Sequence, residues 1–369
     1  MKTRMFLLAA AAAALAGCAQ NEVIDIPQTR AIGFDPYVGN TTRAAAKDTD
    51  LSALQAEGAG FIVLGGYKDG QTYVPVFDGT SETGSHITWN KSSWEYSPIN
   101  YWLEGKTYKF VAYAPAELQE GDLFDIDYVY NRLKMKDGRT FTADGETDLV
   151  VAEGKSQGYL VSAEPVQMEP VGFKFYHALS KVKFTFINGW RNAVNLKITN
   201  IKLSSVKNTG SLTTSGTMAQ GSDKIPSSAW SGQTGTADYE DKASGMNTNV
   251  YEESYEFENF LLPTALNDSQ MKLTFTVQVT NSQGTGPDLG TGAGNPVVKE
   301  VVIPKDVVTE WKPGYAYNYK LTISGSTFGL KPIQFDGIDV DSEWGNGGED
   351  DMDAVSYTHL RAHETLSDL

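Results

Sequence analysis

The chain is poor in cysteine and in long apolar runs. Its 369 residues include a single cysteine, Cys18, so an internal disulfide cannot form. A lone thiol in an exported chain is a free thiol, an intermolecular bridge or a modification site. After the first residues, no stretch approaches the roughly 18 apolar residues that a membrane-spanning helix needs. The sequence therefore excludes an internal disulfide and gives no sign of a transmembrane helix.

Basic residues are also few. Thirty Lys and Arg stand against 46 Asp and Glu, which gives a formal net charge of −16 and a pI of about 4.7. Nucleic acids attract basic surfaces, so this balance argues against a nucleic-acid partner. Long helical periodicity is missing as well, and the best helical candidate is the short run that starts at Leu51.

Motifs that carry chemistry are absent from the sequence. There is no nucleophile elbow or phosphate loop, and carboxylates are too abundant for any pair of them to stand out. His86 and His177 lie far apart, each in a strand-rich aromatic run, and we interpret both as structural. We therefore predict no catalytic residue, no metal site, no cofactor and no enzymatic activity.

The first residues predict export. Lys2 and Arg4 precede a 12-residue apolar run, Met5–Ala16, which is too short to span a bilayer and is typical of a secretory signal. The run ends in "LAGC", which resembles the lipobox of bacterial lipoproteins. We predict a signal peptide over 1–17 and acylation of Cys18, which would tether the protein to a membrane by its acyl chains. The alternative is an incidental cysteine inside a signal peptide.

Most of the remaining chain predicts short β-strands. Val182, Phe184 and Phe186 alternate with polar residues, and Leu273–Val279 shows the same period of two. Turn-forming residues separate these strands, as in antiparallel sandwiches with one buried face. Two polar segments, Asn208–Asn249 and Asn281–Pro296, are expected to be long, mobile surface loops.

The segment "AIGFDPYVGNTTRAAA" raises a specific question. It predicts a strand with Ile32, Phe34 and Val38 on its apolar positions, and Pro36 restricts such a strand to an edge or a bulge. A trypsin-like protease would cut after the following arginine, between Arg43 and Ala44. The alternative is that Arg43 is an ordinary loop residue. Arg30 precedes the strand, so a cut there would release the anchor and leave the strand in place.

Aromatic residues crowd the segment from His86 to Pro115. Trp89, Trp94 and Trp102 could form a platform on which sugar rings stack, or a packed corner of a sandwich. We favour packing, because large aromatic side chains dominate protein cores.

A set of ordered motifs, each weak alone, marks a resemblance. The pattern "W…W.Y.P..YW..G..Y.F.AYAP" runs from Trp89 to Pro115. It is followed by "DLVVA", "FYHALSKVKFTF", "FLLPTAL", "WKPGYAYNYKLTI" and "IQFDGIDVDSEWGNGG". Together, behind a lipobox, they make the chain resemble the fimbrillin-like lipoproteins of Bacteroidales, the Mfa-like family that builds type V pili.

The resemblance implies two tandem transthyretin-like antiparallel β-sandwich domains, here 44–176 and 177–348, in an outer-membrane lipoprotein of the cell surface. In polymerising members an arginine-specific protease removes the first strand, which here lies within 18–43. A C-terminal strand of a neighbouring pilus subunit then fills the open groove. The candidate donor strand has apolar residues at Ile333, Phe335, Ile338 and Val340. The same segment could instead be the last strand of the second sandwich.

The role within a pilus stays open between stalk, tip and unprocessed anchor, and a glycan-binding surface lipoprotein remains the rival function. The tail, Ala354–Leu369, resembles translated sequencing-adapter DNA and nothing in the family. His359 and His363 have the spacing of a helical zinc pair, but no third ligand is evident. We expect this tail not to belong to the natural protein and the native end to be missing.

Overall fold

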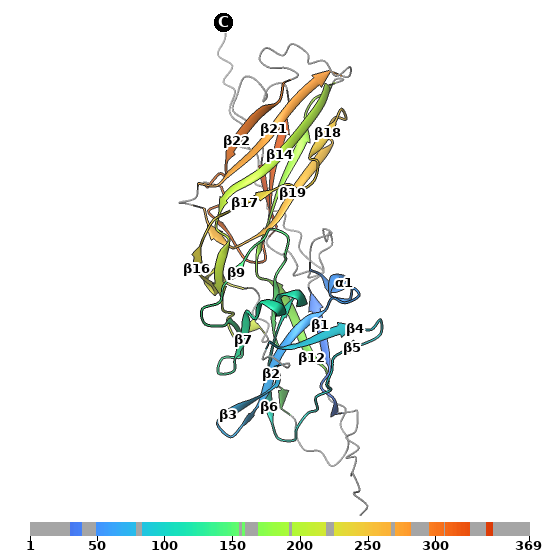
Figure 1. The fold of residues 1–369 in the computed structure, drawn as a ribbon, viewed down its shortest axis with the longest axis vertical. Helices are drawn as coiled ribbons and strands as arrows, with labels where there is room; N and C mark the ends of the chain where they lie inside the picture. The colour runs from blue at the N-terminus through green and yellow to red at the C-terminus, as the bar shows by residue number, and fades with distance from the viewer. Residues whose placement is uncertain are drawn as a thin grey trace, which may run out of the picture.

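The computed structural model describes residues 30–38, 49–78, 83–154, 157–158, 169–191, 194–218, 225–266, 270–281, 295–305, 307–324 and 337–341. Nearly all of the regular secondary structure in these residues is β-strand, which confirms the predicted all-β class. The molecule is elongated, with β2, β6 and β12 toward one end and β14, β21 and β22 toward the other (Figure 1).

The largest sheet of the described residues has nine strands. Its main path runs β1-β12-β10-β6-β2-β4-β5, while β11 pairs with β6 and β3 pairs with β2. The β1 and β12 pair is parallel, and the other pairs in this sheet are antiparallel. The strand bounds are β1 (Phe34–Val38), β2 (Phe61–Asp69), β3 (Thr72–Phe77), β4 (Ser85–Trp89), β5 (Trp94–Glu95), β6 (Thr107–Ala114), β10 (Val150–Glu153), β11 (Gln157–Gly158) and β12 (Val171–His177).

The middle of this sheet is buried on both faces. Successive residues of β2 alternate between two hydrophobic clusters: Phe61 and Val63 pack into one, and Ile62 and Leu64 into the other. The side chains of β6 and β10 also alternate between these two clusters along each strand. Burial on both faces explains why these strands are continuous apolar runs, since a strand with one solvent-exposed face would alternate apolar and polar residues. We call the cluster that includes Phe61 and Phe34 the lower core, and the other the middle core.

The opposite end of the molecule contains two facing sheets. One has the order β19-β13-β24-β25, with β13 and β24 parallel, and the other has the order β17-β14-β21-β22, with β18 paired to β14. A third cluster, the upper core, lies between them. The bounds are β13 (Ser180–Asn188), β14 (Val194–Val206), β17 (Ala237–Glu240), β18 (Met246–Thr248), β19 (Ser254–Leu261), β21 (Lys272–Asn281), β22 (Val297–Val302), β24 (Ala316–Ile323) and β25 (Gly337–Asp341).

Short elements connect the two ends. A small sheet joins β9, β15 and β16, while β7 pairs with β8 and β20 with β23. Helix α1 (Leu51–Leu54) lies where the sequence predicts a short helix, and the Asp50 side chain caps it by accepting a hydrogen bond from Ala53 N. The bounds are β7 (Phe124–Asp127), β8 (Arg132–Met135), β9 (Phe141–Thr142), β15 (Thr209–Leu212), β16 (Trp230–Thr234), β20 (Thr264–Ala265), β23 (Glu310–Trp311), and the 3₁₀ helices η2 (Ala116–Gly121) and η4 (Ser227–Ala229).

The prediction of a surface loop over Asn208–Asn249 was wrong for its described part. Strands β15 to β18 lie within it, and Leu212, Trp230 and Tyr239 are buried. Sparse apolar residues at the right strand positions suffice here, because the surrounding sheets supply the rest of the core. Most of the other expected loop, 282–294, lies outside the described residues.

The expected boundary between residues 176 and 177 falls at the end of β12, just before its short connection to β13. The middle core combines residues from both sides of it, including Tyr113 and Leu149 from one side and Trp230 and Phe260 from the other. The Trp230 indole nitrogen donates to the Ala178 carbonyl at 2.7 Å. The two halves therefore share a hydrophobic cluster at the expected boundary.

Candidate functional site

The first strand forms an edge of the nine-stranded sheet. Five residues of β1 pair in parallel with β12, from Phe34 opposite Val171 to Val38 opposite Phe175. Phe34, Pro36 and Val38 are buried and Asp35 is exposed, so the inward positions follow the period of two that a strand requires. An edge strand can leave a sheet without breaking a pair inside it. Its loss would expose the unpaired backbone groups of β12.

The Phe34 ring is the centre of an aromatic cluster. It stacks on Phe173 with 5.7 Å between ring centroids and meets Phe77 edge-on at 5.2 Å. Three more rings contact it, so that the side chain is only 5% exposed; these rings belong to Phe61, Tyr96 and Phe110. Since the surrounding rings come from four strands and from the segment around Tyr96, removing Phe34 would open an apolar pocket in the lower core.

Residues 96–102, which we call the clip, form hydrogen bonds with the residues just before β1. Ile32 N donates to the Asn100 carbonyl at 2.9 Å, and Trp102 N donates to the Arg30 carbonyl at 2.8 Å. The Tyr96 hydroxyl donates to the Ile32 carbonyl at 2.7 Å. Burial of this hydroxyl raises the pKa of Tyr96 to about 12. The aromatic motif thus anchors the first strand, a role that its sequence alone did not reveal.

The chain is anchored again soon after β1. Thr49 N donates to the Asp148 carboxylate at 2.8 Å, and the Thr49 hydroxyl donates to the Asp148 carbonyl at 3.0 Å. His177 Nδ1 lies 3.0 Å from the same carboxylate, and all three residues are buried. Residues 39–48, which include Arg43 and Ala44, lie outside the described residues and join these two anchored points. A cut there would separate β1 from the body and leave the new first residues close to the Thr49 anchor.

The three tryptophans do not form a shared flat platform. Trp102 is 2% exposed and packs edge-on against Tyr108, with 4.8 Å between ring centroids. Trp89 and Trp94 are half-buried, and their rings are tilted by 54° to each other. The Trp94 ring also packs against Phe61 at 5.1 Å. This geometry favours the packing interpretation, because sugar-binding rings need an exposed, shared face.

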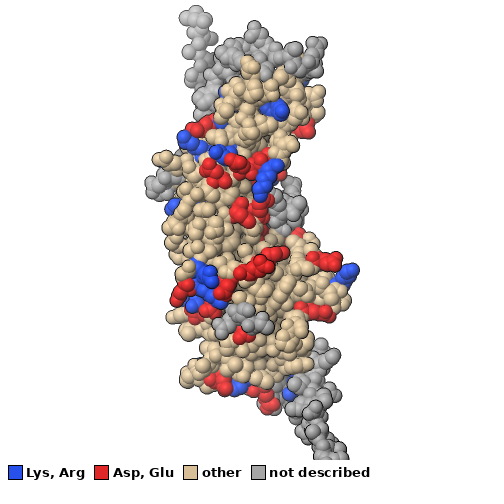
Figure 2. Space-filling model, viewed as in Figure 1, with Lys and Arg blue, Asp and Glu red and all other residues tan. Residues whose placement is uncertain are grey.

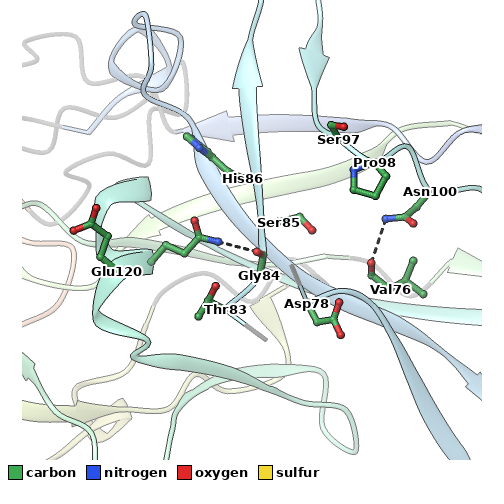
Figure 3. A pocket seen from close by; sticks show the side chains of 11 residues that line it. Val76, Asp78, Thr83, Gly84, Ser85, His86, Ser97, Pro98, Asn100 and Glu120 are labelled. Atoms are coloured by element: carbon green, nitrogen blue, oxygen red, sulfur yellow. Dashed lines mark hydrogen bonds between the residues drawn. The ribbon is translucent and has the colours of Figure 1, made fainter. Parts of the chain in front are cut away.

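An open cavity of about 660 Å³ is lined by residues of β4, η2 and the clip (Figure 3). Two side-chain hydrogen bonds join neighbouring segments of its wall. The Gln119 amide donates to the Gly84 carbonyl, and the Asn100 amide donates to the Val76 carbonyl. His86 donates from Nε2 to the Ala59 carbonyl at 2.7 Å. The described residues that line it include no Phe, Tyr or Trp; they are Val76, Asp78, Thr83, Gly84, Ser85, His86, Ser97, Pro98, Asn100, Gln119 and Glu120.

The candidate donor strand is only partly described. Ile338 and Val340 belong to β25, which pairs antiparallel with β24, and both pack against the upper core. Ile333 and Phe335 lie outside the described residues, as do Cys18, the signal peptide over 1–17 and the tail with His359 and His363. In this structure β25 is thus an edge strand of its own sheet.

The described part of the chain offers little basis for metal binding or for a membrane-spanning helix. Within those residues there is no cluster of His, Cys, Asp and Glu able to hold a metal ion, and no helix with the length and apolarity of a membrane span. Acidic and basic side chains are intermixed on the face shown in Figure 2. Several form ion pairs, such as Lys106 with Asp69 at 2.6 Å.

Comparisons with known proteins agree with the ordered motifs. A family model described as fimbrillin-like matches residues 42–335. Fimbrium subunit Fim1C of Phocaeicola vulgatus is 32% identical over 123 residues, and the match spans about a third of that relative, 32% of each chain. A crystal structure of a fimbrial protein from Bacteroides vulgatus is similar with a TM-score of 0.52 and 18% identity, covering 86% of this chain and 100% of that one. The structural match supports the fold, and the family model covers most of the sequence: the chain belongs to the fimbrillin-like family.

Proposed function

We propose that this protein is a structural subunit, stalk or tip, of a type V pilus, and that its first strand is a removable placeholder. The observation that carries this proposal is the position of β1: an edge strand whose inward residues fill the lower core. An edge strand of this kind leaves an apolar groove and free backbone groups when it departs. Strand addition from another chain satisfies both.

The proposed pathway begins with export. Acylation of Cys18 tethers the chain to the outer membrane, and an arginine-specific protease then cuts after Arg43. This position is supported by the location of residue 43 within the ten-residue connection 39–48, between β1 and the Thr49 anchor. The match to the fimbrillin-like family begins at residue 42, after β1. Partners in this proposal are other pilus subunits, which supply a C-terminal strand to the open groove.

A pair of matched variants tests the proposal. Arg43→Lys keeps the charge but removes the site of an arginine-specific protease, whereas Arg30→Lys changes an arginine that precedes β1. Each variant replaces the gene in the native host, and the ladder of surface polymers is measured by immunoblotting. We expect polymers to disappear with Arg43→Lys and to persist with Arg30→Lys. Normal polymers from Arg43→Lys would overturn the role of cleavage at this position.

The rival function, a glycan-binding surface lipoprotein, is less well supported. Trp102 is buried in the lower core, and the remaining two indoles are half-buried and tilted. An unprocessed anchor would keep β1 permanently, and the same Arg43→Lys experiment distinguishes it, because an anchor is unaffected by loss of the arginine.

A further inference from the structure

The turn between β7 and β8 exposes large side chains where turns are usually small and polar. Its residues 128–131 read Tyr-Val-Tyr-Asn and include neither glycine nor proline. Val129 is 71% exposed and Tyr130 is 60% exposed. Strand β7 lies on the flank of the elongated molecule, between its two ends (Figure 1). Because so little of these two neighbouring side chains is buried, packing within the chain does not account for them.

The backbone of this turn is fixed by two charged side chains. Lys109 Nζ donates to the carbonyls of Tyr128 and Val129, at 2.7 and 3.1 Å. The Asp127 carboxylate accepts from Val129 N at 3.1 Å and from Tyr130 N at 3.4 Å. The exposed side chains are therefore presented from an ordered support, which lowers the entropy that a ligand must overcome on binding.

The Tyr130 ring has one face covered and the other available. The Arg132 guanidinium lies over the ring, with 4.6 Å from its central carbon to the ring centroid. Asp127 Oδ2 holds that guanidinium, since two of its nitrogens lie 3.0 Å away. The cation–π contact sets the tilt of the ring. The exposed surface of the ring is then its opposite face and its outer edge, with an ion pair directly beside it.

A second segment meets the turn next to Tyr130. Gly216 has a φ of +80°, and a Cβ added to it would lie 2.3 Å from the Tyr130 carbonyl oxygen and 3.5 Å from Tyr130 Cβ. Ser215 and Thr217, which flank this close approach in the chain, are both exposed, and their hydroxyls lie 2.9 Å from each other. The surface thus combines a flat apolar ring with hydroxyl groups and an ion pair.

The size and charge of this surface decide between classes of ligand. A tyrosine side chain buries about 150–250 Å² at most, whereas a stable protein interface needs about 800 Å² on each partner. One sugar ring matches the smaller area, and it offers an apolar face and hydroxyls that can hydrogen-bond at its rim. The formal net charge of −16 repels acidic ligands, so a neutral sugar is favoured over an acidic one.

We propose that the turn between β7 and β8 is a binding site for a neutral saccharide, in which a pyranose ring stacks on the open face of Tyr130. The sugar hydroxyls then hydrogen-bond with the Arg132–Asp127 pair and with the hydroxyls of residues 215 and 217. This site is separate from Trp89, Trp94 and Trp102, which the rival function would use. It goes beyond the proposed pilus role and does not depend on removal of β1.

Affinity electrophoresis of the full chain, with β1 in place, tests the site. Native gels contain yeast mannan, dextran or barley β-glucan as neutral probes, or alginate as an acidic one. Tyr130→Ala removes the ring, and Tyr130→Phe keeps it. The matched control is Tyr251→Ala: this tyrosine is 37% exposed, follows an exposed valine and also lies over a guanidinium, that of Arg191 at 4.8 Å. Because Tyr130 is mostly exposed, all three variants should melt within about a degree of the parent.

We expect at least one neutral polysaccharide to slow the parent, Tyr130→Phe and Tyr251→Ala alike, and alginate to slow none of them. Tyr130→Ala should need about tenfold more of that polysaccharide for the same retardation, because it loses the stacking contact. Equal retardation of Tyr130→Ala and the parent, or an equal loss in Tyr251→Ala, would show that the sugar does not bind at Tyr130. Retardation by alginate alone would overturn the class of ligand, and retardation by none of the four would overturn the site. None of these results bears on the polymer ladder of Arg43→Lys, so the two proposals fail separately.

Discussion

Replacing Phe34 by alanine should destabilise the protein strongly. The side chain is 5% exposed and contacts five aromatic rings drawn from four strands and the clip. Truncation of a buried phenylalanine costs about 3–5 kcal/mol, because it removes apolar burial and leaves a cavity that neighbours fill only in part. At about 2–4 °C per kcal/mol for a unit of 150–250 residues, the melting temperature should fall by roughly 6 °C or more.

The matched control is Asp35→Ala, one position along the same strand. Asp35 is exposed, so this change should alter stability by about 0.5 kcal/mol or less. Both variants are compared with the parent by thermal unfolding, and hydrogen exchange of the β1 amides shows whether the strand detaches before the rest unfolds. If Phe34→Ala melts within a degree of Asp35→Ala, the lower core does not depend on β1, and the placeholder interpretation is refuted.

Three further predictions concern the contacts around β1. Tyr96→Phe removes the hydrogen bond to the Ile32 carbonyl, so the β1 amides should exchange faster. The pKa of Tyr96 is raised from 10.0 to about 12, so the stability that its neutral hydroxyl contributes is complete below pH 10 and is lost between pH 10 and 12. Tyr96→Phe should therefore lose less stability than the parent over this pH range in alkaline unfolding curves. Asp148→Ala should cost about 3–5 kcal/mol in chemical denaturation, since it leaves Thr49 N and His177 without their shared buried carboxylate. Trp89→Ala should leave surface polymers unchanged on immunoblots, whereas a protein that binds glycans through Trp89 would lose retention on polysaccharide columns.

The regular strands could be predicted from the sequence because their side chains alternate. Leu273, Phe275, Val277 and Val279 all face the upper core, as their spacing indicates. The all-β class followed from many such segments. The prediction failed for Asn208–Asn249, whose described strands are short and polar and depend on neighbouring sheets for their burial.

The arrangement around β1 could be predicted only in part. Ile32, Phe34 and Val38 were expected on one face, and the structure buries all three in the lower core. The clip and the Thr49 anchor were not predicted, because their hydrogen bonds join residues 64 to 99 positions apart and use backbone groups that every residue carries. The aromatic spacing showed that a packed corner was present, but it did not show what was packed there.

The central claim is that β1 is a placeholder, and the mature N-terminus tests it most directly. Mass spectrometry of the protein recovered from surface polymers of its native host would identify the first residue of the assembled chain. The account predicts a chain that begins at Ala44. Assembled chains that begin at an acylated Cys18 and retain β1 would contradict it.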